Sequence, residues 1–246
     1  MRDTTTTEQP SELHDPEHRH RDVRGGGARA AVFGVSDGLV SNVSLVLGMV
    51  GAHPATAAVR LAGLAGLFGG ALSMAAGELI SMRAQAELLE RELEVERAEI
   101  ARHFEGERHE LQMIYERRGI APRVAGELAT EMMATPERAL ETHAREELGI
   151  DPDEMGSPVK AAVASFGSFA LGAVVPPVPI LAASGTGAAL LAVSLSAVAA
   201  ALVGATLAHF SGRSPWRSAL RQVVVCAGAA AVTFGIGTMV HHLSGL

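Results

Sequence analysis

The stretch GTGAALLAVSLSAVAAALVGATLA, residues 185–208, decides the fold of this chain. It runs through 24 residues without a charged side chain. A helix needs about 20 consecutive apolar residues to cross the hydrocarbon core of a bilayer, whereas a helix on the surface of a soluble bundle carries a polar stripe. This stretch has the length and lacks the stripe, so it predicts a membrane-spanning helix.

Four further apolar stretches predict spans for the same reason. They cover residues 30–50, 61–82, 161–183 and 222–240. Small residues crowd them, which lets helices approach closely in lipid, where no hydrophobic force drives helices together. Pro176, Pro177 and Pro179 lie inside the stretch 161–183 and must break its hydrogen-bond ladder. The sequence therefore predicts an all-α membrane protein with five transmembrane helices.

The charged residues concentrate between the second and third predicted spans. Residues 84–158 hold 19 of the 27 acidic residues and nine of the 20 basic ones, a net charge of −10. Residues 161–246 hold no acidic residue. An acidic block inside an apolar chain indicates a soluble insertion between membrane segments.

Helical patterns without any strand signal fill this insertion. The expected helices cover residues 85–103, 107–117 and 123–147, the last with Pro136 as a point where it can break. The predicted organisation is a flexible tail over 1–28, spans one and two over 29–83, a three-helix metal-binding domain over 84–158 and spans three to five over 159–246.

Arginine placement predicts the orientation, because cytoplasmic connections carry an excess of basic residues. Arginines 19, 21, 24 and 29 lie shortly before the first span, and arginines 213, 217 and 221 separate the fourth and fifth. The alternate connections, 51–60 and 182–187, hold one basic residue between them. The tail and the insertion are therefore expected on the cytoplasmic side. The net charge of −7 gives no reason to expect a nucleic-acid partner.

Six side chains of the insertion are candidate metal ligands. They are Glu96, Glu99, Glu107, Glu110, His143 and Glu147. Within each expected helix they are three or four residues apart, a spacing that puts both members of a pair on one face. Carboxylates with an imidazole favour Fe²⁺, Mn²⁺ or Zn²⁺ over Mg²⁺ or Ca²⁺. The alternative interpretation is a solvated surface of ion pairs, which is what acidic helices with interspersed arginines usually form.

Asp37 and Glu78 are ionisable residues inside predicted spans, where such residues are costly and usually face a polar pathway. Met74, Glu78 and Met82 recur every four residues and share one face of their helix. Thioether and carboxylate groups suit a transition metal in passage. The alternatives are core packing for the methionines and a turn or helix cap for Asp37, which stands in Ser36-Asp37-Gly38.

These motifs resemble the vacuolar iron transporter family, in its bacterial branch. The resemblance rests on GVSDGLV at 34–40, ALSMAAGE at 71–78, Glu147-Leu148-Gly149 and GAVVP at 172–176. It covers residues 28–244 and implies a five-span homodimer that exports Fe²⁺ from the cytosol in exchange for protons. A bacterial inner membrane is the implied location.

Carried over by position, Asp37 and Met74 match the family's membrane metal site, and Glu96, Glu99, Glu107, Glu110 and Glu147 match its insertion-domain glutamates. The chain departs from the family pattern at three positions. Ala30 and Gly66 stand where the family has membrane acids, and His143 stands where it has a methionine. The two lost acids put proton coupling and metal stoichiometry in question, and Glu78 is a candidate replacement.

The leading hypothesis is a transporter, not an enzyme, for Fe²⁺, with Mn²⁺ and Zn²⁺ as further candidate ions and no prosthetic group. Its expected partners are the lipid bilayer, the divalent metal, protons and a second copy of the chain. Two alternatives stay open: a membrane-anchored, carboxylate-bridged iron oxidase, and a metal-sensing membrane module without flux.

Overall fold

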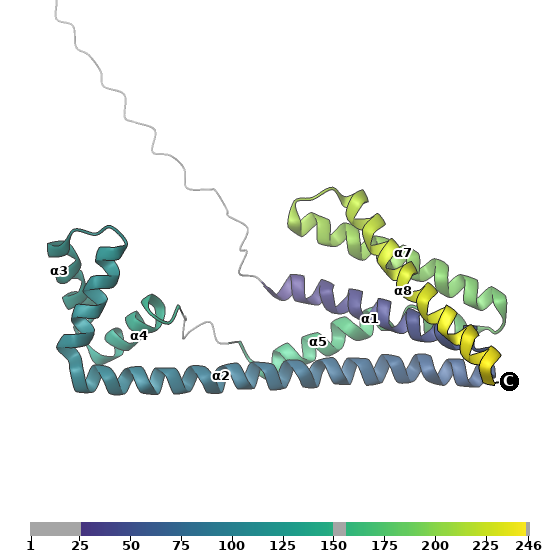
Figure 1. Ribbon diagram of the computed structural model, residues 1–246, viewed down its shortest axis with the longest axis horizontal. Coiled ribbons are helices and arrows are strands. Elements are labelled where there is room, and N and C mark those ends of the chain that lie inside the picture. The colour runs from purple at the N-terminus through teal and green to yellow at the C-terminus, as the bar shows by residue number, and fades with distance from the viewer. Residues whose placement is uncertain (1–25, 150–155, 245–246) are drawn as a thin grey trace, which may run out of the picture.

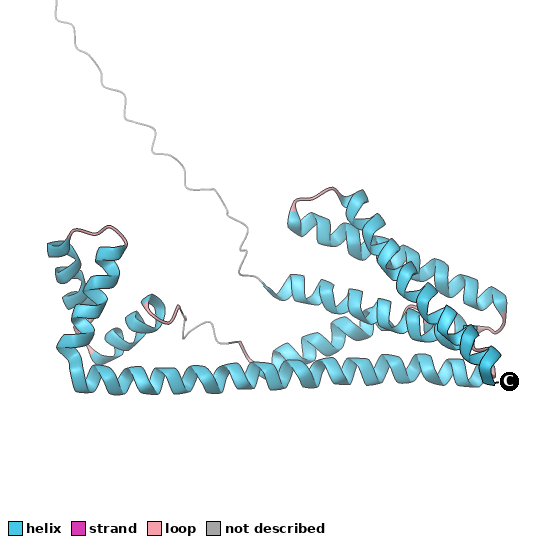
Figure 2. Ribbon diagram, in the orientation of Figure 1, coloured by secondary structure: helices cyan, strands magenta, loops and turns pink. Residues whose placement is uncertain are grey.

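The structure is a computed structural model, which describes residues 26–149 and 156–244. Over these residues the chain is helical and has no strand (Figure 2). Its helices are α1 (Gly26–Gly51), α2 (Thr56–Arg117), α3 (Pro122–Met132), α4 (Pro136–Glu146), α5 (Pro158–Ala173), α6 (Pro177–Ala182), α7 (Thr186–Ser211) and α8 (Pro215–Ser244). Of the predicted tail over 1–28, residues 1–25 lie outside the described part of the chain, and α1 already begins at Gly26.

Helix α2 joins the two halves of the molecule. It contains 62 residues and runs from the apolar bundle to the small group formed by α3 and α4 (Figure 1). Its backbone leaves helical geometry at His103, where φ is −132° and ψ is 38°. Beyond this kink the helix turns back toward α3 and α4. The second predicted span and the first two insertion helices are therefore one kinked helix.

Four helices of the described residues are long and apolar enough to cross a membrane. They lie at Ala31–Gly51, within Thr56–Arg117, at Thr186–Ser211 and at Pro215–Leu243. The remaining predicted span, residues 161–183, is not one continuous helix. It is divided into α5, which has 16 residues, and the six-residue α6. The break predicted from the prolines is confirmed, whereas the count of five spans stays a prediction.

The break between α5 and α6 follows from proline chemistry. Pro177 has no N–H to donate to the carbonyl of Ala173, four residues earlier, as a continuous helix would require. The side-chain amide of Asn42 in α1 takes over, because its Nδ2 donates to the Ala173 oxygen at 2.5 Å. The same nitrogen donates to the Gly63 oxygen of α2 at 3.1 Å. One buried side chain thus ties α1, α2 and the broken segment together.

Glycine residues, which have no side chain, let α1 and α5 pack with their backbones in contact. A Cβ atom at Gly172 would collide with the carbonyl of Val35, and one at Gly38 would collide with the carbonyl of Phe169. Small residues allow this approach, which is how helices associate in lipid. The contact fixes α1, and with it Asp37, against α5.

The charged half of the chain has an apolar core of its own. Leu111 and Tyr115 from the end of α2 pack with residues of α3 and α4, and Ile100 joins them from the other side of the kink. The structure divides the predicted helix 123–147 into α3 and α4 at the anticipated point. Pro136 opens α4, and the N-cap Thr135 accepts a hydrogen bond from the Arg138 N–H at 3.2 Å.

Candidate metal centre

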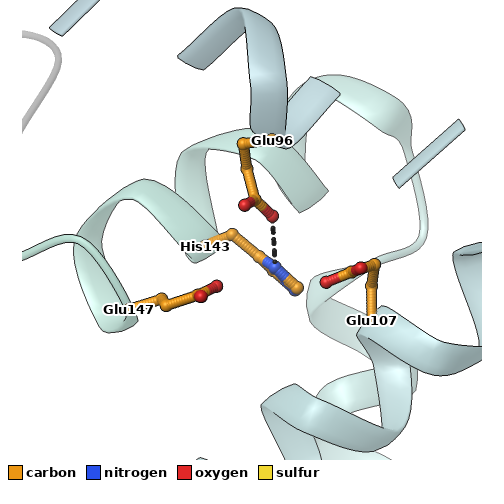
Figure 3. A group of neighbouring side chains, drawn as sticks. All are labelled: Glu96, Glu107, His143 and Glu147. Atoms are coloured by element: carbon orange, nitrogen blue, oxygen red, sulfur yellow. Dashed lines mark hydrogen bonds and ion pairs between the residues drawn. The ribbon is translucent and has the colours of Figure 1, made fainter. Parts of the chain in front are cut away.

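Four of the six predicted insertion ligands meet at one point. Glu96, Glu107, His143 and Glu147 each offer a ligand atom, and these atoms lie within 4.8 Å of one another. Figure 3 shows the three carboxyl groups directed toward the imidazole ring. The kink at His103 brings Glu96 and Glu107 together from opposite sides of the bend in α2. Helix α4 supplies His143, and Glu147 follows at its C-terminal cap.

The innermost contact of this cluster joins a carboxylate and an imidazole. His143 Nδ1 lies 2.9 Å from Glu96 Oε1, and the two residues are only 1% and 4% exposed. The other ring nitrogen, Nε2, is buried without a hydrogen-bond partner among the described residues. Buried polar atoms nearly always have a partner. A ring nitrogen that faces carboxylates and lacks a partner fits a site for a cation.

The electrostatics of the cluster favour protons when no cation is bound. Burial and the negative charges of Glu96 and Glu110 raise the pKa of Glu147, although His143 lowers it. Burial, followed by the same two charges, raises the pKa of Glu107, again against the effect of His143. These carboxyl groups therefore keep their protons to higher pH than ordinary glutamates do, because each added negative charge repels the others.

The pKa of His143 is also raised, through opposing effects. Burial alone lowers it, but the hydrogen bond to Glu96 and the charges of Glu96, Glu147 and Glu107 outweigh burial. A divalent cation would replace the proton on this ring and neutralise the surrounding carboxylates. The chemistry of the cluster suits a first-row transition metal such as Fe²⁺ or Mn²⁺, because it combines oxygen ligands with one imidazole.

Glu99 and Glu110, the other two predicted ligands, lie at the rim of this cluster. Both are exposed and stand outside the four-residue group. Their charges nevertheless reach it, since Glu110 raises the pKa of both Glu107 and Glu147, and Glu99 that of Glu107. Their negative charges therefore act on the cluster although their side chains stand outside it.

Of the three residues predicted for a metal site in the membrane, two lie together in the structure and one lies apart from them. Asp37 and Met74 both line a cavity of about 330 Å³ between α1, α2 and α5. Asp37 is exposed, and its Oδ1 accepts a hydrogen bond from the Ser41 hydroxyl at 3.4 Å. Glu78 is half-buried and is not among the residues that line this cavity. The structure thus brings together the aspartate and the methionine and leaves Glu78 one turn away.

Three further polar side chains line the membrane cavity and were missed from the sequence. They are Ser41, Asn42 and Ser73. The signal for Asn42 was present, because an amide in the middle of an apolar span needs a hydrogen-bond partner. What could not be read from the sequence is that this partner is a carbonyl freed by a proline 135 residues away.

Comparison with known proteins agrees with this arrangement. A family model described as "VIT family" matches residues 28–238 of the chain. The chain belongs to the VIT family. Its match to this family spans both parts of the molecule, from the start of α1 to within α8.

Relatives in this family carry one recurring name. The vacuolar iron transporter of Acanthamoeba castellanii is 35% identical over 236 residues, which are 92% of this chain and 84% of that protein. Vacuolar iron transporter 1 of Oryza sativa is 30% identical over 94% of this chain and 91% of its own length. Vacuolar iron transporter 1 of Eucalyptus grandis is 29% identical, over 95% and 94%. The resemblance found in the sequence motifs is confirmed, and the chain is an integral membrane protein.

Proposed function

We propose that this protein carries Fe²⁺ out of the cytosol across a bilayer in exchange for protons, with Mn²⁺ as a second cargo. One observation carries the proposal. Glu96 stands on the same long helix, α2, that brings Met74 to the membrane cavity of Asp37, and there it meets Glu107 from beyond the kink and His143 and Glu147 from α4 and its C-cap. One helix thus connects a site that could collect a cation with a cavity that could pass it into the membrane. The names of the relatives supply the substrate class.

The insertion domain, residues 84–158, would collect the ion. A buried imidazole with three carboxyl groups selects a transition metal over the more abundant Mg²⁺ and Ca²⁺. The exposed glutamates at its rim raise the local concentration of cations, because a surface of one charge sign attracts its counter-ions. Capture at the cluster would be followed by transfer to the membrane cavity.

Asp37 and Met74 would hold the ion on its way across. A carboxylate in a membrane span is either neutralised by a proton or paired with a cation. Since both compete for the same oxygen atoms, loading Asp37 with a proton from one side displaces the metal toward the other. This competition is a physical basis for antiport that needs one carboxylate only, which suits a chain with Ala30 and Gly66 at the family's other acidic positions.

The proposed orientation puts the insertion domain in the cytosol. The start of α1, the insertion and the turn between α7 and α8 lie toward the same end of the spans (Figure 1). That turn and the start of α8 carry Arg213, Arg217 and Arg221, as a cytoplasmic connection does. In this orientation α5 and α6 together form the third of five spans, with the break held inside the bundle by Asn42. The membrane would be the inner membrane of a bacterium.

We further propose that the working unit is a homodimer. Asp37 is exposed on the surface of the single chain, and a carboxylate that faces lipid is costly. Apolar side chains of the neighbouring helix α2 are exposed as well, with Leu61 at 69% and Leu72 at 62%. A second copy that covers this face would remove Asp37 from lipid and complete the walls of the pathway.

The test is ion flux by the purified full-length protein in sealed liposomes, with Fe²⁺, Mn²⁺ and Zn²⁺ compared under an imposed pH gradient. The proposal predicts Fe²⁺ movement that is accelerated by the gradient and accompanied by opposite proton movement. Oxygen consumption with Fe²⁺, measured in parallel, distinguishes the oxidase alternative. Metal binding without any flux would contradict transport and favour the sensing alternative.

A further inference from the structure

The side-chain oxygen of Asn42 has no hydrogen-bond partner among residues 26–149 and 156–244. The residue lies in the middle of α1 and is 1% exposed. Its Nδ2 donates to two backbone carbonyls, those of Ala173 and Gly63, at 2.5 and 3.1 Å. Carbonyl oxygens only accept hydrogen bonds, so these contacts fix which end of the amide carries the nitrogen. Oδ1 must therefore point away from both carbonyls.

That oxygen is buried and unpartnered. Oδ1 has no hydrogen-bond partner among the described residues, although buried polar atoms nearly always find one. Asn42 also lines the membrane cavity with Asp37 and Met74. A Cβ atom built at Gly66, which lines the same cavity, would lie 2.5 Å from Oδ1. The absence of a side chain at Gly66 thus keeps the space beside this oxygen open.

We propose that the amide oxygen of Asn42 is a ligand of the cation that passes through this cavity, together with Asp37 and Met74. This inference rests on the proposed transport function and assigns a residue to the ion's path. The oxygen is held in place by the amide nitrogen of the same side chain, so it is positioned before the ion arrives. The proline break in α5–α6 supplies one of the two carbonyls that hold it.

A neutral oxygen suits an ion that must leave again. Asp37 contributes one negative charge against the two positive charges of the cation, and Asn42 adds coordination without adding charge. Two further oxygen atoms are available from Ser41 and Ser73, which line the same cavity. A site with several oxygens and one thioether favours the six-coordinate ions Fe²⁺ and Mn²⁺ over tetrahedral Zn²⁺. Asn42 is thus expected to contribute to selectivity as well as affinity.

Two glycine substitutions on α2 test the role of the Asn42 amide oxygen. In Gly66→Ala the new methyl group meets Oδ1 and the Cδ2 atom of Leu45, at 2.5 and 2.6 Å, so it takes the space beside the amide oxygen. Gly69→Ala is the matched control, because a Cβ atom there has nothing within 4 Å. Both changes add the same methyl group to the same helix, and only the first reaches the amide oxygen.

The experiment measures Mn²⁺ and Zn²⁺ binding to the full-length protein in which Glu107→Ala and His143→Ala disable the insertion cluster, so that binding reports the membrane cavity. We expect Gly66→Ala to weaken Mn²⁺ binding at least about tenfold, since even groups that only support metal ligands are worth about 10–100-fold. Zn²⁺ binding should fall less, and Gly69→Ala should behave like the parent. Unchanged Mn²⁺ affinity in Gly66→Ala, or no binding in the parent, would overturn the assignment.

Asn42→Asp is a second variant. It keeps an oxygen at the cavity but removes the donor to the Ala173 and Gly63 carbonyls, so its thermal unfolding midpoint is measured beside its metal affinity. In the folded variant the added negative charge should make the cavity bind Mn²⁺ more tightly and release it more slowly. An affinity equal to that of the parent would contradict a ligand role. Because these are binding measurements, they stand apart from flux: a wild-type protein that binds Mn²⁺ in the cavity but moves no ion would overturn the transport proposal and leave the assignment of Asn42 in place.

Discussion

His143 Nδ1 lies 2.9 Å from Glu96 Oε1, in a part of the insertion domain where both side chains are almost fully buried. The contact spans 47 residues of sequence and joins α4 to the long helix α2. Without it, each residue would be a buried polar group in need of a partner. The pair therefore holds the insertion domain together and at the same time stands at the centre of its candidate metal site.

The first prediction concerns this pair. His143→Ala leaves the Glu96 carboxyl buried without its partner, and breaking a buried pair costs about 3–5 kcal/mol. We expect faster hydrogen exchange in α4 and the second half of α2, and loss of high-affinity Fe²⁺ binding. Arg123→Ala is the control, because its ion pair with Glu127 is exposed on both sides and such pairs are worth about 0–1 kcal/mol. Equal effects of the two changes would contradict the role given to His143.

The second prediction concerns pH and the ion-free insertion domain. The pKa values of Glu107, Glu147 and His143 are all raised in the folded state. A raised pKa stabilises the folded state below the ordinary pKa of the group, and this contribution is lost as the pH rises through the raised value. For His143 this loss begins as the pH rises above about 6.5, the pKa of an ordinary histidine. Hydrogen-exchange protection of α4 should therefore decrease toward pH 8.

Metal binding should show the opposite dependence on pH. The ion must displace protons from the same three groups, so Fe²⁺ affinity is expected to rise from about pH 6 to about pH 8. Glu99→Gln is a useful control, because Glu99 is exposed at the rim and stands outside the four-residue cluster. Its charge is the smallest of the causes that raise the pKa of Glu107, so Glu99→Gln should shift the pH dependence far less than Glu107→Gln does. An affinity that does not change with pH would show that these side chains do not bind the ion.

The third prediction concerns the contact between α1 and α5. Gly172→Ala puts a methyl group against the carbonyl of Val35, where backbone atoms cannot move aside. Overpacking of this kind costs about 1–3 kcal/mol or more. We expect a lower thermal unfolding midpoint of the detergent-solubilised protein. Gly167→Ala lies on the same helix, has nothing within 4 Å of the added Cβ, and should leave the midpoint unchanged.

Much of the fold follows from local patterns in the sequence. Long uncharged runs predict α7 and α8, and Pro136 and the cluster around Pro177 mark two real breaks. The kink at His103 could not be anticipated, because neither proline nor glycine stands at that residue. It arises where α2 folds back so that Leu111 and Tyr115 can pack with Ile100, α3 and α4. Such tertiary packing produces no periodic pattern in the sequence.

The residues of the candidate metal sites were also predictable only in part. Spacing and resemblance predicted six metal ligands in the insertion. They gave no reason to separate Glu99 and Glu110 from the four that meet in the structure, which are Glu96, Glu107, His143 and Glu147. Which glutamates turn inward depends on the direction of the chain after the kink, and that is a property of the fold. Asn42 was missed because its partner is a carbonyl that becomes available only when α5 ends at Ala173.

The central claim is that the cation passes Asp37 on its way through the membrane, and flux through the Asp37→Asn variant tests it most directly. The variant keeps the size of the side chain and removes its charge. Fe²⁺ flux into proteoliposomes under a pH gradient should fall to the level of empty liposomes, while Fe²⁺ binding by the insertion domain stays intact. Glu78→Gln, the matched control on α2, removes a carboxylate that does not line the cavity and should retain most of the flux. Wild-type flux by Asp37→Asn would contradict the account.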